Sequence, residues 1–321
     1  MTQRDLSLPA LVVTVLAWAS AFVGIRAVSD TFSPGALTLG RLLVALLALL
    51  VIVRPRLTSV PRGRDAWLTL LYGAAWFGVY NVALNAAERD LDAGTTALIV
   101  NIGPILIAVL AGWFLREGFP RPLLVGMGIA FAGVVLIAVS TRADSSAVST
   151  ATTLGVVLCV VAAVCYAIGA VAQKPTLAVV PPSTSVWFGC LIGALLCLPF
   201  GPTLVSELGD ATPTDVGWVV FLGVVPSAIG FTTWAYAIKR LSAGQVASST
   251  YLVPLTTTLM SWVVLDEIPA TLAFVGGALC LVGVAVTRLR PRSRTQQRAD
   301  AGDVGTVGVE DLGDQVVDDG R

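Results

Sequence analysis

The sequence predicts an all-α polytopic membrane protein with ten transmembrane helices, arranged as two inverted five-helix repeats. Of its 321 residues, 56% are hydrophobic and only 12% are charged, whereas a soluble domain carries about a quarter charged residues. The chain also holds ten apolar stretches close to the roughly 20 residues that a membrane helix requires. One segment occurs twice, which indicates an internal duplication.

The ten expected spans are residues 8–28, 35–53, 66–86, 94–114, 121–140, 153–172, 184–200, 216–236, 244–264 and 270–288. The first span follows Arg4 and Asp5 without a small-residue cleavage site, so we interpret it as a retained helix and not as a signal peptide. The segment 289–321 begins basic and turns acidic. It has too few large apolar residues to form a core, so we predict a disordered cytoplasmic tail.

The duplicated segment runs from Leu115 to Ile137 and again from Leu265 to Val286. Each copy has a Glu in third place, a Pro soon after it, and then an apolar helix with Gly at matching positions. The matching pairs include Pro104/Pro254, Glu117/Glu267, Gly126/Gly276 and Gly133/Gly283. The repeats therefore cover residues 1–140 and 150–288. Because each repeat has an odd number of spans, the second is inverted in the membrane relative to the first.

The positions of the basic residues orient this bundle. With the N-terminus inside, 16 of the 20 Lys and Arg residues fall on the inner side, and only Arg89 and Arg142 lie in outer loops. Positive residues concentrate on the cytoplasmic side of membrane proteins. We therefore expect a multi-pass protein of the plasma membrane, a bacterial inner membrane, with both termini in the cytoplasm.

Arg41 has the most distinctive chemistry of the candidate residues. It lies about six residues into the second span, roughly 9 Å deep at 1.5 Å per residue. A guanidinium that faces lipid is costly, so Arg41 should face the protein interior or a wet cavity. There it can anchor the carboxylate of a substrate or another anion. The alternative is a structural Arg that binds backbone carbonyls near the interface.

Two prolines, Pro104 and Pro254, interrupt the fourth and ninth spans at matching places, where each frees a backbone carbonyl and permits a kink. Paired interruptions point to the binding site of a carrier, although kinks can also serve packing alone. We expect polar and aromatic residues of these and neighbouring spans to line a substrate cavity. Interfacial or interhelical roles are the alternative. The candidates are Trp18, Ser20, Trp76, Tyr80, Asn81, Asn101, Tyr166, Trp234 and Tyr251.

Glu117 and Glu267 stand where one helix ends and the next begins. A carboxylate at such a place can cap the incoming helix and interact favourably with its dipole. Structural capping is therefore the preferred interpretation, and proton coupling is the alternative. The two residues fall on opposite membrane faces, so they cannot act together as an acid–base pair.

The inventory of reactive residues argues against an enzyme. The chain has no His, and its five Cys lie in apolar spans without metal-ligand spacing, so we expect no metal site. Motifs for a zinc hydrolase, a nucleophile elbow and a phosphate-binding loop are absent. We expect no cofactor and no nucleic-acid partner. The expected partners are a small-molecule substrate and the lipid bilayer.

The pattern Pro104, Glu117, Gly126 and Gly133, repeated in the second half, resembles the EamA domain. Two tandem copies, over about residues 10–288, resemble the ten-helix members of the drug/metabolite transporter superfamily. The resemblance implies a secondary active transporter that exports small metabolites, such as amino acids or related amphiphilic solutes. Alternating access between the two repeats would move the substrate through a central cavity.

The sequence is also compatible with other functions. The same superfamily contains sugar-phosphate and nucleotide-sugar antiporters, which should show several basic residues deep in their spans. A membrane scaffold or receptor would need a polar module or long loops, and a channel would need a charged ring or a carbonyl filter. Ten spans can form a complete carrier, so a monomer and a homodimer are both compatible with the sequence.

Overall fold

The computed structural model describes residues 5–52, 60–91, 96, 99–144, 153–265 and 271–289, and within these ranges every regular element is helical. Glu267 and nearly all of the predicted tail therefore lie outside the described residues. Among the described residues, seven helices are long and apolar enough to cross a membrane, and two shorter apolar helices accompany them. The all-α prediction is confirmed, whereas the count of ten spans stays a prediction.

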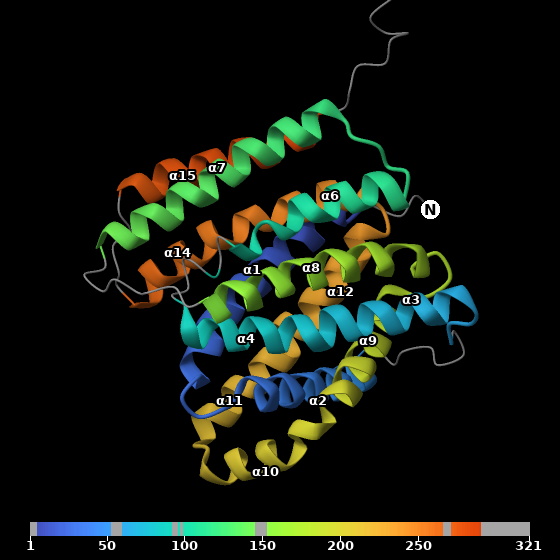
Figure 1. Cartoon of the computed structure of the whole chain (residues 1–321), viewed down its shortest axis with the longest axis vertical. Helices are drawn as coiled ribbons and strands as arrows, with labels where there is room; N and C mark the ends of the chain where they lie inside the picture. The colour runs from blue at the N-terminus through green and yellow to red at the C-terminus, as the bar shows by residue number, and fades with distance from the viewer. Residues whose placement is uncertain are drawn as a thin grey trace, which may run out of the picture.

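The described elements follow one another along the chain as shown in Figure 1. They are α1 (Ser7–Val28), α2 (Pro34–Ile52), α3 (Arg64–Tyr72), η1 (Gly73–Tyr80), α4 (Asn81–Asp90), α6 (Gly103–Phe114), α7 (Arg121–Asp144), α8 (Thr153–Thr176), α9 (Pro182–Cys197), η2 (Leu198–Phe200), α10 (Gly201–Asp210), α11 (Pro213–Leu222), η3 (Gly223–Gly230), α12 (Phe231–Ile238), α13 (Ala243–Ser248), η4 (Ser249–Tyr251), α14 (Leu252–Leu265) and α15 (Thr271–Thr287).

Local sequence signals explain where helices begin. The Asp5 carboxylate accepts hydrogen bonds from the backbone N–H and the hydroxyl of Ser7 at the start of α1, and these bonds lower the pKa of Asp5. At α11, Thr212 and Asp215 form a reciprocal capping box, with Pro213 in the first helical position. Such caps satisfy backbone N–H groups that have no partner within the helix.

The structure differs from the sequence prediction after α9. The predicted span at 184–200 ends as a helix at Cys197, and a further helix, α10, follows where a loop was expected. This helix is amphipathic, with Leu204 buried. Glu207 on α10 accepts a hydrogen bond of 2.9 Å from the backbone N–H of Ser33. That bond ties α10 to the start of α2, at the bottom of Figure 1.

Two π-helical segments, η1 and η3, also depart from the predicted regular helices, and they lie 150 positions apart. In η3, Pro226 has no N–H to donate, and the Leu222 carbonyl accepts a 2.8 Å bond from the Ser227 hydroxyl instead. In η1, the carbonyls of Trp76 and Phe77 each accept a 3.0 Å bond from the Asn81 amide. Polar side chains thus satisfy the carbonyls that the wider turn leaves free.

Helices α7 and α15 lie side by side along one edge of the bundle (Figure 1). Their backbones touch through the glycines that the repeat pairs. A Cβ atom added to Gly133 would lie 2.5 Å from the Gly276 carbonyl oxygen, and one added to Gly126 would lie 2.5 Å from that of Gly283. Small residues allow this close approach in lipid, where packing drives helix association.

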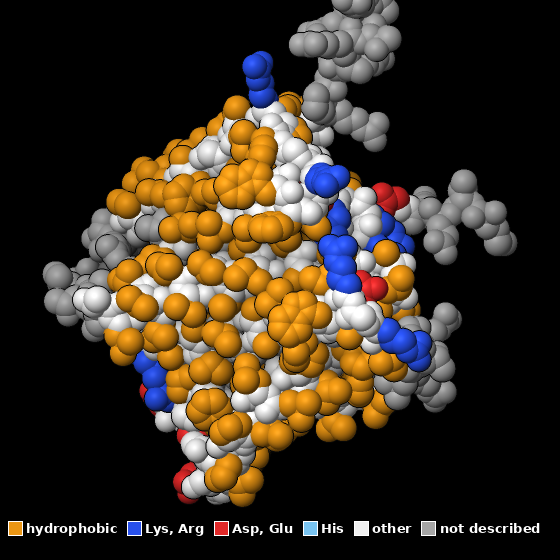
Figure 2. Space-filling view, turned by 45° about the vertical axis from the view of Figure 1, so that its right-hand side comes forward, with side chains coloured by type: hydrophobic (Ala, Val, Ile, Leu, Met, Phe, Trp, Pro, Cys, Tyr) orange, Lys and Arg blue, Asp and Glu red, His pale blue; other side chains and the backbone are white. Residues whose placement is uncertain are grey.

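The largest buried side chains occupy the centre of the bundle, among them Trp76, Trp234 and Tyr72. Outward-facing positions carry exposed apolar groups such as Val51 and Phe114. Figure 2 shows this outer surface as mostly hydrophobic, with Lys and Arg gathered near one edge. A surface of this kind suits lipid contact, because a soluble protein rarely exposes so large an apolar area.

We predict that Gly133→Val will destabilise the protein by about 1–3 kcal/mol, because the added side chain overlaps the backbone of α15. Gly128→Val on the same helix is the matched control, since no atom lies within 4 Å of a Cβ there. Thermal unfolding of both variants in detergent measures the effect. Equal melting temperatures for the two variants would contradict the glycine contact.

Candidate functional site: the central cavity

A cavity of about 700 Å³, including its open part, lies among the helices of both halves of the chain. Its wall combines apolar and aromatic surface with a few polar groups, as is common for small-molecule sites. The first half supplies side chains from α1, α2, η1, α4 and α6. The second half supplies them from α8, α12, η4 and α14. The wall includes Trp18, Arg41, Trp76, Tyr80, Asn81, Asn101, Pro104, Tyr166, Phe231 and Thr250.

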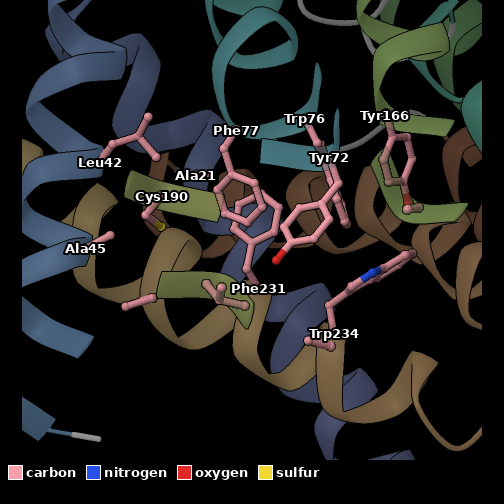
Figure 3. Packing of buried hydrophobic residues seen from close by; sticks show 14 of the residues in the cluster. Ala21, Leu42, Ala45, Tyr72, Trp76, Phe77, Tyr166, Cys190, Phe231 and Trp234 are labelled. Atoms are coloured by element: carbon pink, nitrogen blue, oxygen red, sulfur yellow. The ribbon is translucent and has the colours of Figure 1, made fainter. Parts of the chain in front are cut away.

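Aromatic rings from four elements pack against one another beside this cavity. Trp18 of α1 stacks on Trp234 of α12 with ring centroids 5.0 Å apart. Trp76 of η1 lies 5.3 Å from Tyr166 and 5.0 Å from Phe231. Figure 3 shows Trp76 of η1, Tyr166 of α8, and Phe231 and Trp234 of α12 gathered together. We call the five rings of Trp18, Trp76, Tyr166, Phe231 and Trp234 the aromatic cluster.

Three buried polar atoms of the aromatic cluster have no hydrogen-bond partner among the described residues. They are the indole nitrogens of Trp18 and Trp234 and the hydroxyl of Tyr166, and of these residues Trp18 and Tyr166 line the cavity. A buried polar group without a partner costs free energy. A bound solute with an acceptor or donor can supply that partner, so these atoms favour a ligand with polar groups.

Among the described residues, Arg41 is the one buried residue of the charged types Asp, Glu, Lys and Arg, with 4% of its surface exposed. Its Nε donates a 3.0 Å hydrogen bond to the Ser227 hydroxyl of η3. The bond orients the guanidinium. A guanidinium presents paired N–H groups that match a carboxylate. Arg41 therefore lies in the cavity wall with its guanidinium held by Ser227.

The structure brings most, but not all, of the predicted site residues together. Arg41, Trp18, Trp76, Tyr80, Asn81, Asn101 and Tyr166 lie on the cavity wall. Three others lie away from it. The Ser20 hydroxyl donates to the Ala17 carbonyl. Trp234 stacks on Trp18, and Tyr251 packs against Phe131.

The prolines mark helix breaks and not the kinks predicted within continuous helices. Asn101 and Ile102 form a turn, and Pro104 lies in the first turn of α6 that follows. Pro254 lies near the start of α14, just after the short 3-10 segment η4. Pro104 reaches the cavity wall, whereas Pro254 does not. Because Pro cannot donate to the preceding turn, each break leaves a backbone carbonyl without its usual helical partner.

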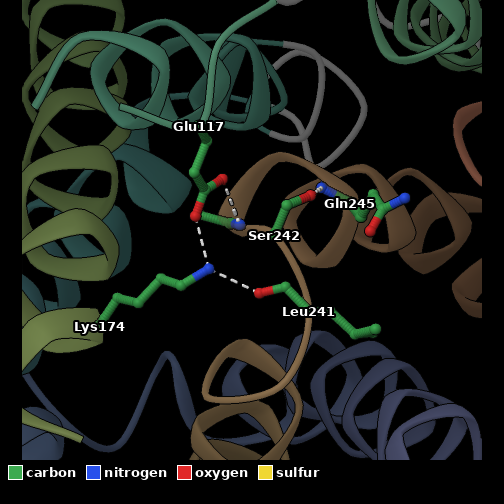
Figure 4. Close-up of polar contacts among 6 residues, drawn as sticks. Glu117, Lys174, Leu241, Ser242 and Gln245 are labelled. Atoms are coloured by element: carbon green, nitrogen blue, oxygen red, sulfur yellow. Dashed lines mark hydrogen bonds and ion pairs between the residues drawn. The ribbon is translucent and has the colours of Figure 1, made fainter. Parts of the chain in front are cut away.

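The sequence analysis predicted that Glu117 caps the helix that follows it. The structure directs its carboxylate elsewhere. Its carboxylate pairs with Lys174 at the end of α8, with 2.5 Å between Oε1 and Nζ. Its other oxygen accepts a 2.8 Å bond from the backbone N–H of Ala243, at the start of α13. Lys174 also donates to the Leu241 carbonyl at 2.6 Å. Figure 4 shows this network, which we call the latch.

The turn that carries Glu117 explains its direction. Arg116 and Gly118 on either side both have positive φ angles, of 57° and 70°. Two left-handed residues reverse the chain sharply after α6, so the side chain between them points back into the bundle. A backbone bond from the Glu117 N–H to the Ala111 carbonyl, at 3.3 Å, closes the turn. The latch thus joins segments from both halves of the chain.

The cavity and the latch lie toward opposite ends of the bundle. Cavity residues run from Trp18 to Ile25 along α1 and from Trp76 to Leu84 along η1 and α4. They therefore extend from the middle of the bundle toward the C-terminal ends of α1 and α4. The latch lies at the C-terminal end of α8, next to the start of α13. The residues that line the cavity do not include those of the latch.

Sequence reasoning missed three residues that shape the site. Phe231 and Ser227 lie within a span, and only the neighbouring Pro226 could have marked the change of helix type there. Glu88 was excluded because the third span was ended at residue 86, whereas α4 continues to Asp90. The position of Glu88, two residues past the predicted end of the span, was the signal in the sequence that could have identified it.

Known proteins share this sequence pattern across both halves. Residues 6–139 and 153–289 each match the EamA-like transporter family. A Streptantibioticus cattleyicolor protein named "Probable terminal-alkyne amino-acid exporter" is 36% identical over 91% of this chain and 97% of its own length. A Salmonella typhimurium protein named "Probable amino-acid metabolite efflux pump" is 27% identical over 93% of this chain and 99% of its own.

A solved crystal structure shares the fold. It aligns with a TM-score of 0.73 and 19% identity, covering 93% of this chain and all of that one. An uncharacterized transporter of Bacillus subtilis is 31% identical over 85% of this chain and 88% of its own length. With the family matched over both halves, this chain belongs to the EamA-like transporter family of the drug/metabolite transporter superfamily, and it is a membrane transporter and not an enzyme.

Proposed function

We propose that this transporter is a secondary active exporter of amino acids and related small amphiphilic solutes that carry a carboxylate. The observation that carries the proposal is the buried Arg41 in the wall of a cavity lined by both halves of the chain. A guanidinium held by Ser227 can bind a carboxylate through two parallel hydrogen bonds. The aromatic cluster offers apolar surface to the remainder of the solute.

The layout that we propose has ten spans in two inverted five-helix repeats, residues 1–140 and 150–288. It is supported by features that recur 150 positions apart, namely the π-helical segments η1 and η3 and the helix breaks before Pro104 and Pro254. Contacts between equivalent residues also support it. The Cys280 thiol, for example, lies 3.5 Å from the carbonyl of Ala130, its counterpart.

Alternating access follows from the opposed positions of the cavity and the latch. In carriers built from inverted repeats, one repeat rocks against the other around a central site. We infer that the latch closes the cytoplasmic end, because Arg64, Arg116, Arg121 and Lys239 flank helix ends on that side. The state described here would then face outward, with both termini in the cytoplasm of a bacterial cell.

The substrate class is inferred from the cavity and from the relatives. Two of them are named for amino acids or amino-acid metabolites, and one name specifies a terminal alkyne. A short apolar side chain of that kind suits an aromatic wall, and its carboxylate suits Arg41. The names of both relatives also motivate export as the direction.

A sugar-phosphate or nucleotide-sugar antiporter is the second candidate. A phosphate carries more negative charge than a carboxylate, and proteins usually meet it with several Arg or Lys groups. Among the described residues, Arg41 is the one basic side chain on the cavity wall. This count favours a solute with a single carboxylate.

We predict that Arg41→Ala will weaken binding of L-propargylglycine, an amino acid with a terminal alkyne, at least about tenfold, because hydrogen bonds to charged groups contribute about 1.5–3 kcal/mol. Transport into or out of proteoliposomes and ligand-dependent thermal stability measure the loss. Arg41→Lys keeps the charge but loses the paired geometry, so it should retain part of the binding.

Two controls make this test specific. Arg62→Ala removes an exposed basic residue outside the spans and should leave binding unchanged. Propargylamine lacks the carboxylate, so any binding of it should be insensitive to Arg41. Wild-type affinity in a folded Arg41→Ala protein would overturn the assigned role of Arg41.

We predict that Glu117→Gln and Lys174→Met will each open the latch end. Losing a half-buried ion pair should shift the equilibrium by about 1 kcal/mol, which is roughly fivefold. The readout is maleimide labelling of a cysteine placed at Val246, a buried position in α13, in a protein without its native cysteines. Arg121→Gln, an exposed change at the same end, serves as the control. Unchanged labelling in both latch variants would contradict a gating role.

A further inference from the structure

A polar stripe runs along α4 beyond the central cavity. Asn81, Asn85 and Glu88 recur at intervals of four and three residues, so they lie on one face of the helix. Asn81 faces the central cavity. Asn85 and Glu88 line a smaller pocket of about 250 Å³ whose wall shares Ile25 with the cavity. The stripe therefore leads from the substrate cavity toward the end opposite the latch.

The amide of Asn85 is 4% exposed, and its orientation is fixed by its neighbours. The Thr38 hydroxyl donates its hydrogen to the Pro34 carbonyl at 2.8 Å. It can therefore only accept from Asn85, whose Nδ2 lies 3.1 Å away. The amide NH₂ must face Thr38, and Oδ1 must face away from it. That oxygen is buried and has no partner among the described residues.

Glu88 presents a second unpartnered acceptor at the same pocket. Its Oε1 is buried and accepts no hydrogen bond within the described part of the chain. Asn85 and Glu88 are three residues apart on one helix face, so their side chains are neighbours. Two acceptors with no donor between them are both costly to bury. One hydrogen shared between them removes both costs.

The pocket is better suited to a proton than to a metal cation. The guanidinium of Arg89 lies on its wall and donates to the carbonyls of Phe32 and Ser29, at 3.0 and 3.3 Å. That positive charge repels a metal ion and occupies two carbonyls that would otherwise be ligands. A carboxylic acid O–H needs no such space, and protonation is the usual response of a buried carboxyl group without a partner.

We propose that Glu88 is a proton-binding site of the transporter, in which its protonated carboxyl group donates to Asn85 Oδ1. On protonation, the carboxylate takes a proton from water entering at the end opposite the latch, and one O–H bond forms. On deprotonation, the proton returns to water at that end or at the other, according to which end is open.

Charged and titratable groups from every neighbouring element act on Glu88, and those of opposite charge link it to the substrate site. Its carboxylate interacts electrostatically with Arg41, so it competes with a substrate carboxylate for the same positive charge. Protonation of Glu88 frees Arg41, and binding of a substrate carboxylate favours protonation in return. The groups concerned are Arg26 of α1, Arg41 of α2, Tyr80 of η1 and Cys159 of α8, and Arg89 and Asp90 follow Glu88 on α4 itself.

This linkage, which rests on the proposed function, has a definite sign. Affinity for a carboxylate solute should be highest at acidic pH, where Glu88 is protonated, and should fall as the pH rises. Each binding event should take up a proton from the medium.

The proton site itself is tested without any substrate. Infrared difference spectra of the purified full-length protein, recorded over a pH series, detect the carbonyl band of a protonated carboxylic acid. We expect a titrating band in the wild type that is absent from Glu88→Gln and shifted in Asn85→Ala, which removes the hydrogen-bond acceptor. Asp210→Asn, an exposed carboxylate on α10, should leave the band in place. Identical spectra for wild type and Glu88→Gln at every pH would overturn the site.

The linkage is tested with L-propargylglycine as the probe. We expect its affinity to fall about fivefold or more across the titration of the band, and expect Glu88→Gln to bind with little pH dependence. Affinity independent of pH in the wild type would overturn the linkage. If the probe does not bind at all, the proposed substrate class fails, while the infrared result still decides the proton site.

Discussion

Every backbone polar group in a membrane span must find its partner inside the protein, and this constraint shapes the transporter. Lipid offers neither donors nor acceptors, so an unpaired carbonyl costs several kcal/mol. The π-helical segments η1 and η3 would violate the rule if Asn81 and Ser227 did not bond to the freed carbonyls. Both residues also serve the cavity, because Asn81 lines it and Ser227 holds Arg41. The same bonds that permit irregular backbone therefore build the site.

Buried charge obeys a similar rule, and the two ends of the molecule meet it differently. At the latch, Glu117 and Lys174 neutralise each other directly. In the interior, Arg41 has a neutral hydroxyl as its partner, and Glu88 lies within its electrostatic reach without an ion pair. The ion pair of Glu117 and Lys174 stabilises the conformation in which it forms. Arg41 and Glu88, which lack such a direct partner, can bind a charged solute or a proton. We therefore associate the latch with conformational change and the region around Arg41 with substrate and proton.

The sequence allowed the helical class, most spans and much of the cavity wall to be predicted, because amphipathic rings and a lone Arg are conspicuous within apolar stretches. Trp18, Trp76 and Tyr166 were found in this way. Partners across the fold could not be predicted, since nothing in the sequence joins Glu117 to Lys174, 57 positions away. Helix α10 was missed because its apolar face is short and polar residues interrupt it. Kinks were predicted at Pro104 and Pro254, whereas the structure has helix breaks there, because the geometry depends on neighbouring helices.

The crossed glycine contacts between α7 and α15 indicate which part of the protein keeps its structure when the two repeats exchange conformations. Gly126 meets Gly283, and Gly133 meets Gly276, so exchanging the conformations of the two repeats maps this interface onto itself. Under the proposed inverted layout, the contact looks the same before and after the transporter turns over. This interface would stay unchanged while the rest of the protein moves, and it would contribute equally to the free energy of both states. A molecule that bound there would alter how firmly the protein holds together, but it would not select the direction in which it faces.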